Sequence, residues 1–255
     1  MVADDFQFWG PIKPSVRGLW KRFFAHDSPL AFQSILRAYV EPGSELLEVG
    51  AGPGYLYPYR LRGNVRRIVG IDPDPCVLEN REIDEGVVGV CEHLPFPNDS
   101  FDIVFHRMVA EHLSEPVAAT AEIARVLRRG GLLIMQTPNA WHYSMLASRC
   151  TPLWFHRKYM HFLATRKQSE DVHPTHYRMN TAAAIRRTVT CAGLEVEGVE
   201  FLTAPPGYLR FSVVAFCAGA LYAKSVESLV PCLRPSIVAV ARKPARRTHV
   251  LSARP

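Results

Sequence analysis

Residues 48–54, Glu-Val-Gly-Ala-Gly-Pro-Gly, constrain the fold of this chain more than any other stretch. They follow the apolar pair Leu46 and Leu47, a pattern that predicts a buried strand running into a glycine-rich turn. Three glycines at alternate positions let the backbone approach a ligand without interference from side chains. A carboxylate at Glu48, two places before the first glycine, would repel a pyrophosphate and attract an ammonium group.

The nearest alternative for such a loop is the dinucleotide fingerprint G-x-G-x-x-G. Gly50 and Gly52 fit its first two glycines, but Tyr55 stands at the third position. The third glycine lets a helix pack closely on the strand, and a tyrosine side chain would obstruct this. At the level of the loop alone, a nicotinamide enzyme and a glycine turn without a ligand stay open as alternatives.

Strand and helix signals alternate along the chain, which favours a parallel sheet covered by helices. Helical periodicity over 116–129 stops at Gly130-Gly131, and a second helix is expected from Asn180-Thr181 through Ala192. Residues 58–62 are expected to form a short helix or turn after the glycine loop. The expected strands are 45–49, 67–71, 87–90, 101–105, 132–135, 194–202 and 237–241.

Composition and charge limit the classes of protein. With 255 residues, 48% of them hydrophobic, the chain can bury a core as one α/β domain without disulfides or metals. The six cysteines include no C-x-x-C pair and the start of the chain lacks a signal-peptide pattern, so we expect reduced thiols in a cytoplasmic protein. Five basic residues and no acidic ones lie in 241–255, which leaves 25 basic against 24 acidic residues elsewhere. This near-neutral body predicts no nucleic-acid partner.

No apolar run reaches the ~20 residues that a membrane-spanning helix needs. The longest run, 211–223, lies within the apolar segment 206–233. This segment can be a buried helix, a dimer surface or an interfacial helix, so peripheral membrane contact through it and the basic tail stays open.

Asp72 ends the second expected strand, where ligands of open α/β sheets bind. A carboxylate there can accept hydrogen bonds from both ribose hydroxyls of an adenosine. The alternative is a turn residue, because Asp-Pro-Asp-Pro over 72–75 is strong turn chemistry.

Residues 48–54 resemble the Asp/Glu-x-Gly-x-Gly-x-Gly loop of class I S-adenosylmethionine-dependent methyltransferases. Residues 89–102, G-V-C-E-H-L-P-F-P-N-D-S-F-D, resemble the G-D-A-E-x-L-P-F-x-D-x-S-F-D block of its small-molecule, type 11-like subgroup. The chain departs from the block at Val90, where the family has an Asp that reaches the adenine amino group. The resemblance covers 45–140 strongly and 180–244 in outline. It implies a doubly wound, Rossmann-like sheet of seven strands with an antiparallel last strand, and S-adenosylmethionine as the cofactor.

The resemblance also implies where the cofactor and the catalytic groups lie. His106 is expected just past the fourth strand, facing the methyl group. Residues 109–113 resemble the family's V-L-E-H segment, whose Glu-His pair is mainly structural. His106, His173 and His176 are the candidate catalytic residues. The expected cofactor-binding residues are Glu48, Gly50, Ala51, Gly52, Gly54, Asp72, Pro73, Cys91, Glu92 and His106.

Residues 141–179 combine histidines with interleaved aromatic residues, which suits a small apolar acceptor. The histidine spacing lacks the tight pattern of structural zinc sites, so no metal is expected. The whole chain is expected to form a single domain. Its parts are a helical cover (1–44), a cofactor-binding core (45–140), an acceptor lid (141–179), the C-terminal half of the sheet with the insert 206–233 (180–244) and a basic tail (245–255).

The function expected from these observations is methyl transfer to a small, lipophilic or aromatic acceptor, on an O, N or C atom. Three alternatives stay open: a regulatory S-adenosylmethionine binder, an NAD-dependent oxidoreductase and an RNA methyltransferase. Val90 favours the first of them, while Glu48 and Tyr55 count against the second. The near-neutral body of the chain counts against the third.

Overall fold

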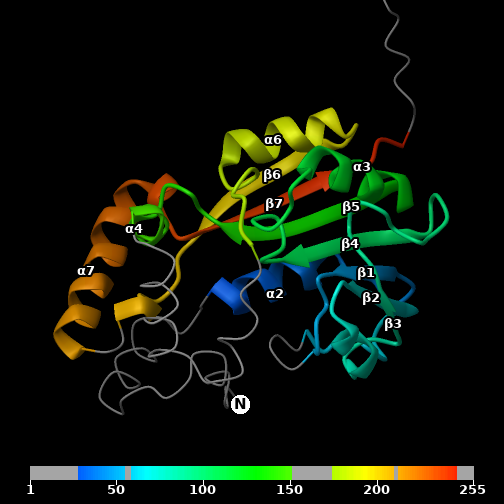
Figure 1. Ribbon diagram of the computed structural model, residues 1–255, viewed down its shortest axis with the longest axis horizontal. Helices are drawn as coiled ribbons and strands as arrows, with labels where there is room; N and C mark the ends of the chain where they lie inside the picture. Colours follow the sequence, from blue (N-terminus) through cyan, green and yellow to red (C-terminus); the bar gives the residue numbers. More distant parts are fainter. Residues whose placement is uncertain (1–27, 55–58, 151–173, 210–211, 246–255) are drawn as a thin grey trace, which may run out of the picture.

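The computed structural model describes residues 28–54, 59–150, 174–209 and 212–245 (Figure 1). Seven strands form one sheet in the order β3-β2-β1-β4-β5-β7-β6. β7 pairs antiparallel with both β5 and β6, while the pairs among β1 to β5 are parallel. The strands are β1 (Glu45–Val49), β2 (Arg67–Asp72), β3 (Glu85–Val88), β4 (Phe101–Arg107), β5 (Leu127–Pro138), β6 (Glu195–Leu202) and β7 (Ser236–Arg242). The expected doubly wound sheet with a reversed last strand is therefore confirmed.

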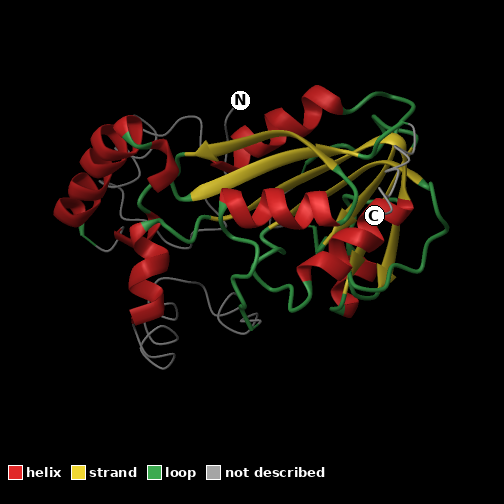
Figure 2. Ribbon diagram, turned by 90° about the horizontal axis from the view of Figure 1, so that it is seen from above, coloured by secondary structure: helices red, strands yellow, loops and turns green. Residues whose placement is uncertain are grey.

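Helices cover both faces of this sheet (Figure 2). α3 (Pro116–Val126) and α6 (Ala182–Cys191) pack on one face through residues such as Ile123 and Ile185. α2 (Ser28–Tyr39) and the short 3-10 helix η2 (Pro75–Glu79) pack on the other through Phe32 and Val77. The core consists of two clusters of buried apolar side chains, one on each face.

α4 (Tyr143–Cys150) and α7 (Val213–Leu229) lie beyond the end of the sheet toward which β4 and β5 point (Figure 1). The described residues of the expected apolar insert 206–233 include α7 and two 3-10 turns, η4 (Gly207–Leu209) and η5 (Pro231–Leu233). α7 buries Phe216 and Ala223, while Val214 and Leu221 are 79% and 69% exposed. In the part of the chain that the structure describes, no helix is long and apolar enough to cross a membrane.

Several expected boundaries are corrected. β3 begins and ends two residues before the expected 87–90, because its ladder follows β2 and ends at the pair of Asp72 and Val88. The expected helix 116–129 ends at Val126, since Leu127 is extended and begins β5. β5 is longer than the expected 132–135 because β7 pairs with it from Leu132 to Pro138.

Candidate functional site

The glycine loop begins where β1 ends, at the edge of the sheet where open α/β folds bind ligands. Gly50, Gly52 and Gly54 all have positive φ, of 72°, 49° and 79°. Residues with side chains rarely adopt this conformation. A Cβ atom at Gly50 would collide with Val109, and one at Gly54 would collide with Asn80. All three glycines are therefore required by the shape of the loop.

The backbone N–H groups of Gly50, Ala51 and Gly52 are engaged inside the protein. Those of Gly50 and Ala51 donate to the Ile71 carbonyl over 2.8 and 3.3 Å. That of Gly52 donates to Asp72 Oδ2 over 2.9 Å, and Pro53 has none. A phosphate-binding loop works by presenting free N–H groups to the anion. Residues 50–53 present none, so this turn suits a cationic or neutral group better than a pyrophosphate.

Carboxylates surround the same loop. Glu48 is the penultimate residue of β1, and burial raises the pKa of its carboxyl well above the usual value, with repulsion from Glu82 and then Asp72 acting in the same direction. Asp72 ends β2, and its second oxygen accepts the N–H of Asp74 at 2.8 Å. Glu82 and Asp72 therefore oppose the ionisation of Glu48, and a cationic ligand would relieve this repulsion.

The next strand ends present a mixed surface. Val90 is 47% exposed, and Pro73 is exposed beside Asp72. Glu92 is half-buried. Cys91 is buried with its Sγ 3.9 Å from the Ala119 carbonyl, and burial raises the pKa of its thiol to about 12. The Cys91 side chain is therefore a packing group.

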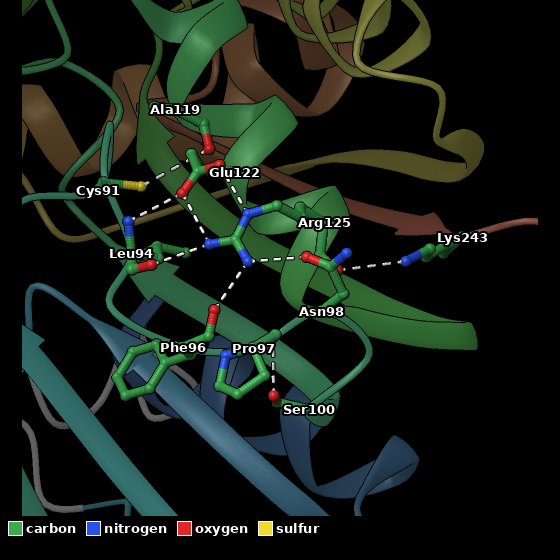
Figure 3. A network of polar contacts seen from close by, with 10 residues as sticks. All are labelled: Cys91, Leu94, Phe96, Pro97, Asn98, Ser100, Ala119, Glu122, Arg125 and Lys243. Atoms are coloured by element: carbon green, nitrogen blue, oxygen red, sulfur yellow. Dashed lines mark hydrogen bonds and ion pairs between the residues drawn. The ribbon is translucent and has the colours of Figure 1, made fainter.

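Arg125 of α3 holds the loop of residues 94–98 that follows (Figure 3). Its guanidinium donates to the carbonyls of Leu94 and Phe96 over 2.9 and 2.7 Å, and to Asn98 Oδ1 over 3.0 Å. Glu122 orients the guanidinium through two bonds of 2.8 and 2.9 Å and accepts the Leu94 N–H at 3.0 Å. The motif that resembled a known family is thus fixed in shape by two α3 side chains outside it.

His106 lies inside β4, in register with Val49 of β1 and Met135 of β5, and not past the end of the strand as expected. The apolar strand simply continues two residues beyond 101–105. The side chain is 2% exposed, its Nδ1 has no partner, and burial lowers the pKa of the imidazole to about 4. His106 is therefore neutral at physiological pH.

A buried polar network follows β4. The Glu111 carboxylate accepts the Thr137 hydroxyl at 3.2 Å, and Thr137 accepts Asn180 Nδ2 at 2.6 Å. The Glu111 carbonyl accepts the N–H groups of His176 and Tyr177. This network, including the buried Asn180, lies outside the sequence predictions because its members come from three distant segments.

The two candidate histidines that the structure describes differ in their surroundings, since His106 is buried and His176 is exposed. His176 is exposed and contacts the network only through its backbone. His173 lies outside the described residues. His112 Nδ1 is 2.8 Å from the Pro174 carbonyl, so the Glu111-His112 pair anchors residues 174–177, in agreement with the structural role expected for it. The described residues contain no cluster of three or more side chains that could hold a metal ion.

Residues 47–135 match the family model of the methyltransferase domain. A protein of Mycolicibacterium smegmatis named as an S-adenosylmethionine-dependent methyltransferase is 31% identical over 61% of this chain and 53% of its own length. The tRNA U34 carboxymethyltransferase of a Shewanella species is 33% identical over 46% of this chain and 35% of its own. The chain thus spans about half the length of the first relative and about a third of the second.

Among solved structures, a methyltransferase in complex with the Haloferax volcanii Trm112 methyltransferase activator has a TM-score of 0.58 at 21% identity. The match covers 98% of this chain and 100% of that one, and shows the shared fold. The sheet order and the glycine loop at the end of β1 define a class I methyltransferase fold. Residues 47–135 thus match the methyltransferase domain, and the sheet around them has the fold of the S-adenosylmethionine-dependent methyltransferases, whose cofactor is S-adenosylmethionine.

Proposed function

We propose that this protein transfers the methyl group of S-adenosylmethionine to a small acceptor that binds beside the carboxyl ends of β4 and β5. One observation carries the proposal. The loop of residues 50–54 has no N–H group free for an anion at 50–53, and it lies among the carboxylates of Glu48, Asp72 and Glu82. This environment selects a cationic cofactor over a dinucleotide.

The proposed cofactor contacts follow the strand ends. The methionine portion of the cofactor lies against the small residues of the loop, Gly50, Ala51, Gly52 and Gly54. The carboxylate of Glu48 balances the positive charge of its ammonium group. Asp72 accepts the ribose hydroxyls, since a carboxylate oxygen that already accepts one N–H has a second lone pair. The adenine lies toward Pro73 and Val90, with the backbone of Cys91 and the side chain of Glu92 at its edge.

When bound, S-adenosylmethionine supplies a methyl group attached to a sulfonium. The sulfur is a good leaving group, because it departs as a neutral thioether. The chain must then hold the acceptor in line, and such positioning contributes ~7–11 kcal/mol in favourable cases. His106 is the candidate for receiving a proton from the acceptor, because its neutral imidazole carries a lone pair and its Nδ1 has no partner; the lowered pKa of about 4 makes it a weak base. His176 and His173 are weaker candidates.

The acceptor side is bounded by α4, α7 and the residues that follow β5 (Figure 1). Aromatic side chains gather there. The ring centroids of Tyr143 and Tyr222 lie 5.1 Å apart with the rings edge to face, and those of His142 and Tyr143 lie 4.2 Å apart. Such a wall favours a lipophilic or aromatic small molecule. The relative that acts on tRNA makes RNA the second candidate acceptor.

Calorimetry tests the cofactor. We expect heat of binding with S-adenosylmethionine and none with NAD; the reverse pattern would contradict the proposal. Gly52→Val should abolish binding, because it forces a branched side chain into a left-handed turn 3.9 Å from Asp72. Gly63→Val is the matched control, since Gly63 has a φ of 78° but lies in open space away from the loop. Asp72→Ala should also weaken binding strongly.

Transfer of a labelled methyl group tests the acceptor. We expect incorporation into one member of a panel of lipids, quinones and small aromatic compounds, with bulk tRNA as a separate arm. Labelling of tRNA alone would replace the small-molecule proposal by RNA methylation. Tight cofactor binding with nothing labelled in any arm would indicate a regulatory binder.

A further inference from the structure

Asn80 contacts the glycine loop of residues 50–54. It immediately follows η2, its side chain is 7% exposed, and its Nδ2 donates to the carbonyls of Ala51 and Gly52 over 3.2 and 3.1 Å. Its Oδ1 accepts the N–H of Glu82 at 2.9 Å. Because that bond fixes which end of the amide is oxygen, the NH₂ group must face the loop.

The two bonds determine the shape of the loop. Asp72 draws the Gly52 N–H to one side, while Asn80 draws the carbonyls before and after it to another. The hydrogen bonds therefore restrict the rotation of the peptide units on both sides of Gly52. Gly54 packs against the same amide so closely that a Cβ there would overlap Asn80 Oδ1 and Cγ. One asparagine thus contacts three of the five residues from Gly50 to Gly54.

We propose that Asn80 is a positioning residue for the cofactor: its amide presets the glycine loop in the conformation that binds S-adenosylmethionine. The proposal rests on the function proposed above. Its physical basis is preorganisation, because a loop that is already ordered loses less conformational freedom when the ligand binds. Glycines give the loop access to its left-handed turns, and without Asn80 the same glycines would let it leave them.

The test is calorimetric titration of S-adenosylmethionine into wild type, Asn80→Ala and Asn80→Asp. Asn80→Ala removes both bonds and should raise Kd by about tenfold or more. Asn80→Asp keeps the volume and the bond from Glu82, but replaces the donor by an oxygen that faces two carbonyls. It should therefore bind at least as weakly as Asn80→Ala. Affinity near that of wild type in Asn80→Asp would show that only the volume matters and would overturn the proposal.

Two controls separate positioning from loss of stability. Asn64→Ala removes an exposed asparagine that donates to the Arg60 carbonyl, and should leave Kd unchanged. Ile68→Val shortens a buried side chain at the start of β2, and should lower the melting temperature without changing Kd. If Ile68→Val weakens binding as much as Asn80→Ala does at equal loss of melting temperature, the effect is general destabilisation and the proposal fails.

A double-mutant cycle with Gly54→Ala gives an independent readout. In wild type the new methyl group strikes the Asn80 amide, whereas in Asn80→Ala only the strain of positive φ remains. Gly54→Ala should therefore weaken binding by a smaller factor in the Asn80→Ala background. Equal factors in both backgrounds would contradict the contact. Failure of wild type itself to bind S-adenosylmethionine would instead refute the proposed function, so the two outcomes are distinguishable.

Discussion

Replacing Glu111 by glutamine should make the protein more stable at alkaline pH. Burial raises the pKa of the Glu111 carboxyl to about 7 from its ordinary 4.5, although bonds from its own backbone and Thr137 and the charge of Arg107 act in the opposite direction. The folded state therefore holds a proton that the unfolded chain releases. A glutamine keeps an oxygen for the Thr137 hydroxyl and cannot ionise.

The magnitude follows from the two pKa values. Above pH 7 the folded protein must ionise a buried carboxyl, and the difference between about 7 and 4.5 corresponds to about 3 kcal/mol of unfolding free energy. Below pH 4.5 both states are protonated and this destabilising effect disappears. Stability from this group is therefore full at acidic pH and is lost as pH rises toward and through 7. From pH 5 to pH 8 the loss should be about 2–3 kcal/mol.

Urea unfolding of wild type and Glu111→Gln at pH 5, 6.5 and 8 measures this loss. Differences between the two proteins cancel the titration of every other group. We expect the free energy of unfolding of Glu111→Gln, relative to wild type, to rise by about 2–3 kcal/mol across that range. A constant difference at all three pH values would refute the reasoning, because it would mean that Glu111 titrates alike in the folded and unfolded states.

Three further predictions concern groups with other surroundings. Glu48→Gln should stabilise the ligand-free protein at neutral pH, since the raised pKa of Glu48 makes its ionised form costly, yet weaken S-adenosylmethionine binding; urea unfolding and calorimetry check the two effects. Cys91 should resist iodoacetamide at pH 8 in the folded protein while the exposed Cys217 reacts, and peptide mass spectrometry that finds native Cys91 alkylated would contradict its burial. Arg125→Lys should cost about 2 kcal/mol in urea unfolding because a lysine cannot donate to Leu94, Phe96 and Glu122 together; a change below about 0.5 kcal/mol would show that the charge alone suffices.

Local patterns were enough to predict most of the sheet. The strand 45–49 and its glycine turn were located from the sequence, because an apolar run followed by glycines has few other solutions. The antiparallel β7 came from a resemblance, since the direction of a strand leaves no mark in its own residues. The predicted end of β4 at residue 105 was wrong because His106 is polar. In a sequence, a polar residue inside a buried strand resembles the residue that follows the strand.

The supports of the site were beyond sequence analysis for a different reason. Asn80 and Arg125 donate to backbone carbonyls more than 25 positions away in the sequence. Every residue has a backbone carbonyl, so such a partner leaves no pattern in the sequence. An asparagine after an apolar turn reads locally as a turn residue. Its role appears only when the sheet brings the ends of β1 and β2 together.

The reversed strand β7 has a consequence for how enzymes of this shape diversify. Leu202, the last residue of β6, pairs directly with Ser236, the first residue of β7. Residues 203–235 therefore leave and re-enter the sheet at neighbouring points on one edge, as a hairpin loop does. Such a segment can be lengthened, shortened or exchanged at small entropic cost without shifting the register of any strand. One half of the molecule can then keep its donor chemistry unchanged while the other is rebuilt for a new acceptor, and a chimera that carries a foreign 203–235 should still bind the methyl donor.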